Sequence, residues 1–438
     1  MHHTLPYPND PAQFFSAFAA YWPGAVWLDS GGVAGTRYDI VAGAPRGWLT
    51  LTAGEAWWRP AGGVAWRLPE TPMAAVRSAL DKAPCGPAPF ASGLIGYFGY
   101  DLGRRLAGLS APEDEPEAVL ARYDWAIVLD HVERAAWLAG PQAEPALAAD
   151  IAAVMGTPAP VRHWRVGPIE VDLAAGDYGE AFRRVQDYLH AGDCYQINLA
   201  RRFAAPFEGD PLGAWLALRR HSPGGYGAYL DLPGRPVLSV SPERFLWLRE
   251  GRVSTRPIKG TRAREADPVR DRAVAEALAS SPKDRAENLM IVDLLRNDLG
   301  RVCRIGSVRV PDLFTVERFA TVHHLVSTVT GELPPGRDAV DLVAACLPGG
   351  SITGAPKYRA MQIIDELEPS ARGVYCGAIG YLGDDGAMDT NIAIRTAVVR
   401  DGVIEYRAGG GLVADSEEIA EREETEAKAA AFFRLVGG

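Results

Sequence analysis

The sequence contains no uninterrupted apolar stretch of about 18 residues, the length that a membrane-spanning helix needs, so no membrane partner is expected. The first five residues, Met1 to Leu5, lack both the charged and the apolar region of a signal peptide. Basic residues are not in excess, because 45 Lys and Arg stand against 55 Asp and Glu, for a net charge of -10. Proteins that bind nucleic acids normally carry a basic patch, so this charge argues against a nucleic-acid partner.

Cysteine is scarce, and no two cysteines form a CxxC pair. An odd number of widely spaced cysteines is typical of reduced thiols in a cytoplasmic protein rather than of disulfide bonds or a zinc site. Each could equally be a small core residue. The five are Cys85, Cys194, Cys303, Cys346 and Cys376.

What the chain does contain is enough apolar sequence for a large core, since 47% of its 438 residues are hydrophobic. This length allows two or three domains, although a large β-rich fold can use the whole chain. The composition changes along the sequence and indicates three parts. Residues 1–140 are β-rich, residues 141–176 are a connection rich in Ala and Pro that includes a helix, and residues 177–438 alternate strands with helices.

Hydrophobic patterns predict the individual elements. Short apolar runs between Gly and Pro are typical of strands. Apolar residues at helical spacing predict an amphipathic helix over 177–191 that ends at Gly192. The other expected strands are Ala25–Leu28, Trp48–Leu51, Trp125–Leu129, Leu238–Val240 and Arg252–Thr255, and the other expected helices span 283–298, 356–367 and 416–435.

Lys259 has the most informative setting of any polar residue. It lies between Ile258 and Gly260, with Arg256 and Arg262 three residues away on either side. Nearby cations and burial both disfavour the charged form of a lysine, so we expect the pKa of Lys259 to be lowered. A neutral lysine is a nucleophile, whereas an ammonium is not. The ordinary alternative is a surface lysine on a strand.

Two of the predicted helices each carry a pair of carboxylates three residues apart, a spacing that places both on one face. The pairs are Asp284 with Glu287 and Glu421 with Glu424. Two such pairs can together bind one hard divalent cation. Mg²⁺ suits them, because it takes oxygen ligands and keeps water molecules that a substrate carboxylate can displace.

The two pairs differ in their surroundings. The helix that carries Glu287 is apolar nearly all the way round, which is typical of a buried helix, and a buried carboxylate needs a partner. The second helix, for which Ser416 is the expected N-cap, has Glu424 four residues before Lys428. That spacing is also typical of a solvated helix surface, so the second pair alone does not establish a metal site.

Two glycine-rich segments could bind an anion through backbone amides. Residues 349–357 lack the Lys-Ser or Lys-Thr of a phosphate loop. They predict a turn that feeds a helix, with Pro356 near its first position, and exposed amides there could hold an anion or simply start the helix. Gly409, Gly410 and Gly411 follow a predicted strand and could bring their N–H groups close to a ligand carboxylate, or could form a bulge.

Arg395 is a charge inside an apolar, strand-like run. If it faces inward, it needs an anion, whereas an outward-facing arginine would be ordinary. Strand alternation places the small residues Ala393 and Ala397 on the same side, which would leave room beside the guanidinium.

In order along the chain, these motifs resemble those of the chorismate-utilising, or chorismate-binding, enzymes, most closely the branch that aminates chorismate at C4. The resemblance covers about Asp177 to the C-terminus and is weaker before it, chiefly in Leu28–Ser30 and Arg37–Ile40. It rests on seven ordered segments, 192–199, 241–245, 257–262, 287–294, 350–357, 375–381 and 409–416.

The resemblance implies an α+β, anthranilate-synthase-like fold, in which two large antiparallel β-sheets pack as a sandwich with helices on the outside. The site would lie between the sheets, and the three parts of the chain would form one intertwined unit. The resemblance also implies Mg²⁺ as cofactor, bound to the ring carboxylate of chorismate. Glu287 and Glu424 would be its direct or nearest ligands, supported by Asp284 and Glu421.

By the same resemblance, Arg395 and Tyr375 would hold the enolpyruvyl carboxylate of chorismate, with His324 near the ring. Thr261 and Lys428 would make further contacts with the substrate. The backbone amides of Gly409, Gly410 and Gly411 would assist. Taken without the motif, a histidine at position 324 would be an ordinary hydrogen-bonded core residue.

The expected reaction replaces the C4 hydroxyl of chorismate by an amine. Lys259 would attack C2, the double bond would shift, and the hydroxyl would leave with a proton from Glu243. A glutamic acid in a dry cleft can have a raised pKa, which keeps it protonated as a donor. Ammonia would then add at C4 as Lys259 leaves, giving 4-amino-4-deoxychorismate, a precursor of 4-aminobenzoate and folate.

Three alternatives belong to the same resemblance. Anthranilate synthases carry Ala at the position of Lys259 and aminate C2. Isochorismate and salicylate synthases place a lysine base where this chain has Gln196, and an amide cannot deprotonate water. A non-catalytic regulator that binds chorismate or tryptophan is the third, and the presence of Glu243, Lys259 and both acidic pairs disfavours it.

Two partners are expected besides chorismate and ammonia. In some relatives the N-terminal sheet binds tryptophan, and Ser30, Arg37, Tyr38 and Tyr226 occupy comparable positions, although Gly225 replaces a common Pro. No Gly-x-Cys-x-Gly motif surrounds any cysteine. We therefore expect a separate glutamine amidotransferase subunit to supply the ammonia.

Overall fold

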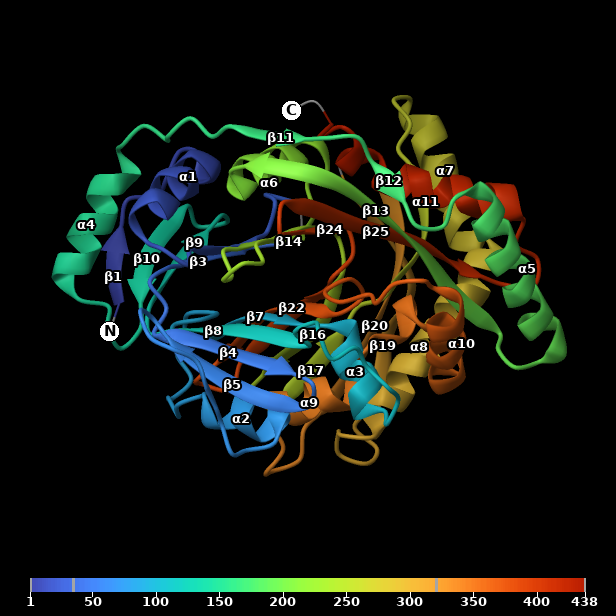
Figure 1. The fold of residues 1–438 in the computed structure, drawn as a ribbon, viewed down its shortest axis with the longest axis horizontal. Helices are drawn as coiled ribbons and strands as arrows, with labels where there is room; N and C mark the ends of the chain where they lie inside the picture. Colours follow the sequence, from blue (N-terminus) through green and yellow to red (C-terminus); the bar gives the residue numbers. More distant parts are fainter. Residues whose placement is uncertain (1, 34–35, 320–321, 437–438) are drawn as a thin grey trace.

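Two large antiparallel β-sheets face each other in the computed structural model, which describes residues 2–33, 36–319 and 322–436 (Figure 1). The first sheet has 13 strands. Its main path runs β1 (His2–Leu5), β10 (Ala135–Ala139), β9 (Ala126–Asp130), β3 (Tyr38–Ala42), β2 (Val26–Asp29), β14 (Tyr226–Leu230), β15 (Val237–Ser241), β24 (Thr396–Arg400), β25 (Val403–Leu412), β13 (Gln196–Gly209) and β11 (Trp164–Val166), while β12 (Glu170–Val171) and β21 (Gly354–Ala355) also pair with β13.

The second sheet has 12 strands and is likewise antiparallel. Its path runs β18 (Ile258–Ala263), β20 (Val322–Glu332), β17 (Arg252–Thr255), β16 (Arg244–Arg249), β23 (Met388–Ile392), β22 (Ala378–Gly383), β7 (Gly93–Phe98), β8 (Ala118–Tyr123), β4 (Gly47–Thr52), β5 (Glu55–Pro60) and β6 (Trp66–Arg67), with β19 (Arg309–Arg318) paired to β20.

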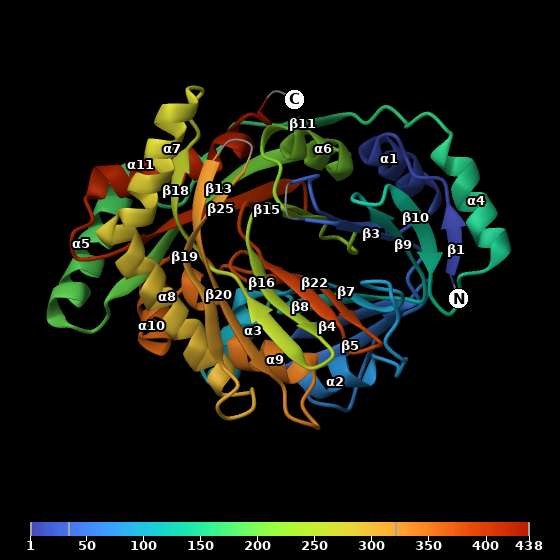
Figure 2. The same ribbon diagram turned by 180° about the vertical axis from the view of Figure 1, so that it is seen from behind.

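Helices cover the outer faces and one end of this sandwich (Figures 1 and 2). Helices α1, α4 and α6 flank the 13-stranded sheet, α2, α3 and α9 lie beneath the 12-stranded sheet, and the others gather at one end. They are α1 (Pro11–Tyr21), α2 (Pro72–Ser78), α3 (Tyr100–Leu106), α4 (Pro145–Met155), α5 (Ala175–Ala191), α6 (Pro211–His221), α7 (Pro268–Ser280), α8 (Pro282–Gly300), α9 (Ala339–Cys346), α10 (Lys357–Leu367) and α11 (Glu418–Phe433), with a 3₁₀ turn η1 (Gly350–Ile352).

The apolar core forms layers that match this arrangement. One cluster, which includes Ile40, Tyr97 and Leu230, joins the facing sides of the two sheets. A second packs α1, α6 and α11 on the outer side of the 13-stranded sheet, and a third packs α2, α8, α9 and α10 on the 12-stranded sheet. The α+β sandwich of two antiparallel sheets expected from the sequence is confirmed.

Strands from both ends of the chain make up each sheet. In the 13-stranded sheet, β2 pairs with β14, and in the 12-stranded sheet, β7 pairs with β22. The N-terminal 140 residues therefore contribute to both sheets alongside strands that come after residue 177.

Most of the elements predicted from the sequence lie within a few residues of their expected bounds. Helix α5 ends at Gly192, whose φ of 82° is the left-handed conformation that glycine adopts readily at a helix C-terminus. Four of the five cysteines are buried and Cys85 is exposed, and all five are free. Over the described residues, no helix combines the length and the apolarity that crossing a membrane requires.

Several local predictions were wrong. Arg395 lies between β23 and β24 with a φ of 52°, so strand alternation does not apply to it. Helix α8 is not buried all round, because Leu289 keeps 44% of its surface exposed. The N-cap of α11 is Glu417, and its side chain accepts no capping hydrogen bond; Ser416 instead donates to Glu421.

The structure narrows the alternatives for the two glycine-rich segments. Residues 349–355 are buried, whereas Pro356 is exposed and, as the N-cap of α10, stands next to the first helical residue as expected. Gly409, Gly410 and Gly411 continue β25 in regular register with β13, so they do not form a bulge.

Candidate active site

Lys259 lies in an irregular part of the edge strand β18. Between the paired positions Ile258 and Thr261, β18 advances three residues while β20 advances two. This one-residue bulge contains Lys259 and Gly260, and Gly260 has a φ of 86°. Bulges redirect side chains and are common beside active sites. The local backbone therefore releases Lys259 from the regular alternation of its strand.

The surroundings of Lys259 favour a neutral amine. Burial lowers the pKa of Lys259, and the nearby ammonium of Lys428 lowers it further, while Glu287, Glu243 and Glu424 act in the opposite direction. The net result is a lowered pKa, as the sequence predicted.

The cause of that shift, however, is not the pair of flanking arginines. Arg256 is ion-paired with Glu317, and Arg262 donates to Asp284 at 2.7 Å. Each guanidinium is thus engaged by its own carboxylate. Burial lowers the pKa as expected, and the contributing cation is Lys428, from the far end of the sequence, instead of the two arginines.

Glu243 lies in the turn that takes the chain from β15 in one sheet to β16 in the other. Only 7% of its surface is exposed, and this burial raises its pKa to about 7, although Lys259 nearby works to lower it. Ser351 donates to Oε1 of Glu243 at 3.4 Å, and this contact also works to lower the pKa. A carboxyl group with this pKa can give up a proton near neutral pH.

Helix α11 brings a cation and two carboxylates to the same region. The Nζ atom of Lys428 lies 2.7 Å from Glu424 and donates to the carbonyl oxygen of Gly409 at 2.8 Å. A side chain at Gly410 would collide with the Glu421 carboxylate, because its β-carbon would be 2.8 Å from Oε2. The glycines of β25 thus allow the acidic face of α11 to approach the sheet closely.

The four predicted metal ligands are only partly brought together. Asp284 is held by Arg262, whereas Glu287 and Glu424 both lie close enough to Lys259 to affect its pKa. Among the described residues, no three His, Cys, Asp or Glu side chains are grouped closely enough to hold a metal ion. The four carboxylates on α8 and α11 nevertheless have the oxygen-only donor chemistry that suits Mg²⁺.

The titration of the α11 carboxylates supports this fit. Burial raises the pKa of Glu421, and the neighbouring Glu424 raises it further. Burial also works to raise the pKa of Glu424, but Lys428, with help from Lys259, brings it below its ordinary value. A bound cation would relieve the repulsion that Glu424 exerts on the ionised form of Glu421.

His324 lies on β20 beside the bulge. Its Nδ1 atom is 2.8 Å from Oγ1 of Thr261, its direct cross-strand partner. Burial, with a contribution from the charge of Arg395, lowers the pKa of His324 to about 4, so the ring is neutral at physiological pH. The adjacent His323 is fully buried against Asp271, which is the ordinary role of a core histidine.

Tyr375 lies in the turn before β22 and is 6% exposed. The guanidinium of Arg372 packs over its ring at 5.7 Å, and burial raises the pKa of Tyr375 well above its ordinary value. The hydroxyl group therefore stays protonated and can act as a donor.

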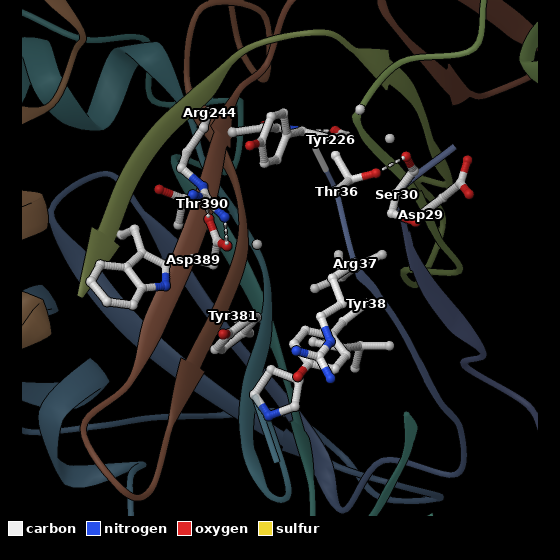
Figure 3. A pocket seen from close by; sticks show the side chains of 18 of the residues that line it. Asp29, Ser30, Thr36, Arg37, Tyr38, Tyr226, Arg244, Tyr381, Asp389 and Thr390 are labelled. Atoms are coloured by element: carbon white, nitrogen blue, oxygen red, sulfur yellow. Dashed lines mark hydrogen bonds and ion pairs between the residues drawn. The ribbon is translucent and has the colours of Figure 1, made fainter. Parts of the chain in front are cut away.

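The four residues expected to bind tryptophan line a single cavity of about 460 Å³ between the sheets (Figure 3). Arg37, paired with Asp130, packs over the ring of Tyr38, and Ser30 donates to Asp39 at 2.6 Å. Figure 3 shows Tyr226 and Arg244 across the opening from Arg37 and Tyr38.

Sequence reasoning missed Arg244 and Asp389 on this cavity. Arg244 donates to both oxygens of Asp389, at 3.0 and 2.8 Å, and its guanidinium lies 5.1 Å above the ring of Tyr226. The available signal was position, because Arg244 directly follows Glu243. These two consecutive residues face different places, one the region of Lys259 and the other the cavity.

Comparisons with known proteins agree on one family. The sequence profile of the chorismate binding enzymes matches residues 38–434. The chain is 47% identical to aminodeoxychorismate synthase component 1 of Klebsiella aerogenes over 96% of both chains. It is 40% identical to anthranilate synthase component 1 of Cereibacter sphaeroides, over 83% of this chain and 77% of that one.

A solved structure shows the same fold. The crystal structure of anthranilate synthase component I from Streptococcus pneumoniae aligns with a TM-score of 0.80 and 31% identity. The alignment covers 90% of this chain and 92% of that chain, so the likeness extends over nearly the whole sandwich.

Proposed function

Because the chain belongs to the chorismate-binding enzyme family, we propose that it is an aminodeoxychorismate synthase component that replaces the C4 hydroxyl of chorismate by an amine. The observation that carries this proposal is the pairing of two residues with complementary pKa shifts. Lys259 has a lowered pKa and can be neutral, while Glu243 beside it has a raised pKa and can be protonated.

These two states suit a displacement through a covalent intermediate. The neutral amine of Lys259 attacks C2 of chorismate, both ring double bonds shift by one position towards C4, and the C4–O bond breaks. Glu243 gives its proton to the departing hydroxyl, which leaves as water. Ammonia then adds at C4, both double bonds return to their first positions, and Lys259 departs from C2 as a neutral amine. The ammonium formed at C4 returns a proton to Glu243, so both residues can be used again. The product is 4-amino-4-deoxychorismate, and covalent catalysis has divided one hard displacement into two easier steps.

The remaining residues bind and orient the substrate in this proposal. Arg395 and Tyr375 hold the enolpyruvyl carboxylate, helped by amides of Gly409, Gly410 and Gly411. Thr261 fixes His324 near the ring through their hydrogen bond. Lys428 helps to keep Lys259 neutral and lies within reach of the same region.

Mg²⁺ is part of the proposal. Glu287 and Glu424 would be its nearest ligands, with Asp284 and Glu421 in support. When bound, Mg²⁺ would neutralise the carboxylate on the chorismate ring and fix its position. The protein side chains have the donor chemistry for this task, since all four offer carboxylate oxygens. Loss of activity on chelation, restored by added Mg²⁺, is the expected result.

Ammonia is proposed to come from a separate glutamine amidotransferase subunit. The relative from Klebsiella is named as component 1, which implies a second component. This chain has no Gly-x-Cys-x-Gly motif to hydrolyse glutamine itself. The purified chain should use ammonium and not glutamine. Product formed from glutamine alone would contradict this part. A cytoplasmic location completes the proposal and suits five free thiols.

The main alternative function is that of an anthranilate synthase component. The 40% identity to such a protein supports this alternative. Lys259 argues against it, because an amine bonded to C2 would obstruct amination at C2. The identity of the aminated product separates the two. With chorismate, Mg²⁺ and ammonium, we expect 4-amino-4-deoxychorismate and little anthranilate.

The covalent step is tested by intact-protein mass spectrometry after addition of chorismate. The native chain should gain a chorismate-derived adduct, and Lys259→Ala should not. Lys82→Ala is a matched control, because Lys82 is exposed and should leave the adduct unchanged. An adduct on Lys259→Ala, or full ammonia-dependent activity in that variant, would rule out the covalent role.

We also propose that the 460 Å³ cavity binds tryptophan through the four residues named for this role, Ser30, Arg37, Tyr38 and Tyr226. Its combination of aromatic rings and a few fixed polar groups suits an aromatic amino acid. Calorimetric titration with tryptophan should show binding that Tyr226→Ala abolishes. Equal binding by the native chain and this variant would contradict the assignment, and Tyr21→Ala, at an exposed tyrosine, is the control.

A further inference from the structure

A second cavity, of about 300 Å³, lies between β24 and β25 of the 13-stranded sheet and the loop that precedes β22. Neither Lys259 nor Glu243 nor Arg395 lines it, although Tyr375 contributes to its wall. Five arginines line the cavity against three carboxylates, those of Asp114, Glu115 and Glu405. Its lining therefore has an excess of positive charge.

Most of these arginines have carboxylate partners. Arg235 and Arg400 share Glu115, and Arg202 pairs with Glu405 at 2.9 Å. Arg372 pairs with Glu368 at 2.6 Å. The exception is Arg407, which forms no ion pair with any residue that the structure describes.

Burying Arg407 without an ion pair costs free energy. It is 94% buried, with 6% of its surface exposed. It donates only through Nη2, to Ser370 Oγ at 3.0 Å and to the carbonyl oxygen of Ala371. Its Nε and Nη1 atoms make no hydrogen bond to a described residue, and neither of them is fully buried. A buried charge needs a counter-charge, and a guanidinium presents its donors as a planar fork.

The strand pairing adds a second reason for an anion at this position. Arg407 of β25 lies directly opposite Arg202 of β13. Like charges directly opposite each other destabilise a pair of strands. Glu405 pairs directly with Arg202, whereas Glu368, Asp172 and Glu405 act on Arg407 only from a distance, without an ion pair. An anion in the cavity would face this arginine pair.

We propose that Arg407 binds the carboxylate of a small organic acid in the cavity between β24, β25 and the loop before β22. The planar fork of the guanidinium matches a carboxylate group. Val374 and Val398 line the same space and would contact an apolar body. Glu115 and Glu405 in the lining would repel a doubly charged ligand, which favours a monocarboxylate over phosphate.

The test uses the full chain, with benzoate and propionate as probes and inorganic phosphate as the comparison. Calorimetric titration should detect benzoate, and Arg407→Gln should weaken its binding about tenfold or more, as expected for losing hydrogen bonds to a charged group. Arg395→Gln should change it less than twofold, which distinguishes this cavity from the substrate region. A crystal soaked in benzoate should show its carboxylate against Arg407.

Val398→Phe provides an independent variant, because it fills the cavity and leaves Arg407 in place. Val398→Phe should also abolish benzoate binding. If Arg407→Gln does not fold, the titration of Val398→Phe decides the question. Unchanged affinity in the folded Arg407→Gln variant, benzoate bound only beside Arg395, or phosphate bound more tightly than benzoate would each overturn the proposal. The proposed C4 amination does not depend on this result.

Discussion

A β-carbon placed on Gly260 would lie 2.9 Å from Oδ1 of Asp284. The bulge that presents Lys259 therefore packs directly against the first turn of α8, with no room for a side chain between them. Gly260 also has a φ of 86°, which L-residues with side chains rarely adopt. The position of Lys259 thus depends on a glycine in close contact with a carboxylate.

We predict that Gly260→Ala lowers ammonia-dependent activity by about a hundredfold, because a displacement of about 1 Å at a reacting group can cost that much. Gly251→Ala is a matched control. Gly251 also has a positive φ, of 74°, but its nearest neighbour is 3.9 Å from the added carbon. Steady-state rates of the two variants make the comparison, and equal activities would show that the contact is unimportant.

The rate of adduct formation should fall as the pH rises through about 7. Glu243 must be protonated to act as the acid, and burial raises its pKa to about 7. At lower pH the rate should fall again as Lys259 becomes protonated, although its lowered pKa limits that loss. Rapid-quench mass spectrometry of the adduct measures both limbs without interference from the titration of ammonia. A rate that keeps rising above pH 8 would contradict the role of Glu243.

Ser351→Ala should move the upper limb of that profile to higher pH. Ser351 donates to Glu243, and this hydrogen bond works to lower the pKa of the acid. Without it, Glu243 should hold its proton to a higher pH. Ser280→Ala, at an exposed serine, is the control. If the rate of adduct formation falls at the same pH in both variants, the Ser351 contact does not affect the pKa of Glu243.

Glu243→Gln should stabilise the protein at pH 8 but not at pH 4. A carboxyl group whose pKa is raised on folding destabilises the folded state wherever it must ionise. For Glu243 this penalty grows between pH 4.5 and about 7 and then stays constant. At 1.36 kcal/mol per pKa unit, a rise from 4.5 to about 7 gives an upper bound of about 3 kcal/mol. Denaturant unfolding of both proteins from pH 4 to 8 measures the difference in their free energies of unfolding. A difference that does not change with pH would refute the prediction.

Trp215→Ala should lower the free energy of unfolding by about 3–5 kcal/mol, the usual cost of removing a large core side chain. Trp215 is fully buried, packs 5.2 Å from Trp27, and donates to the carbonyl oxygen of Ser239. Trp66→Ala, at a half-exposed tryptophan, should change it by less than about 0.5 kcal/mol. Similar losses in both variants would show that the outer core of the 13-stranded sheet contributes little.

The sequence predicted the elements of the sandwich and the setting of Lys259 because these depend on short-range patterns and ordered motifs. It assigned the wrong cations to Lys259, because two arginines near in sequence are each bound by their own carboxylates. Lys428 has the larger influence but comes from a helix about 170 positions later in the chain. Such contacts depend on tertiary packing, which periodicity does not reveal.

Arg395 shows a second limit. Its apolar neighbours are typical of a strand, yet the backbone turns at this residue with a φ of 52°. Neither glycine nor asparagine marks the position, so no turn signal is available in the sequence. Ser416 is similar, because it precedes α11 as an N-cap would but donates to Glu421 instead. In both cases the tertiary structure overrode the preference that the local sequence indicates.

Glu243 and Arg244 are consecutive residues, and their side chains point into two different parts of the molecule. Asp389 anchors Arg244 at the edge of the 460 Å³ cavity, while Glu243 lies beside Lys259. An occupant of the cavity that pushed Arg244 aside would pull on the backbone that holds the acid. Inhibition from a distance would then require no domain movement, only a small rotation within this dipeptide.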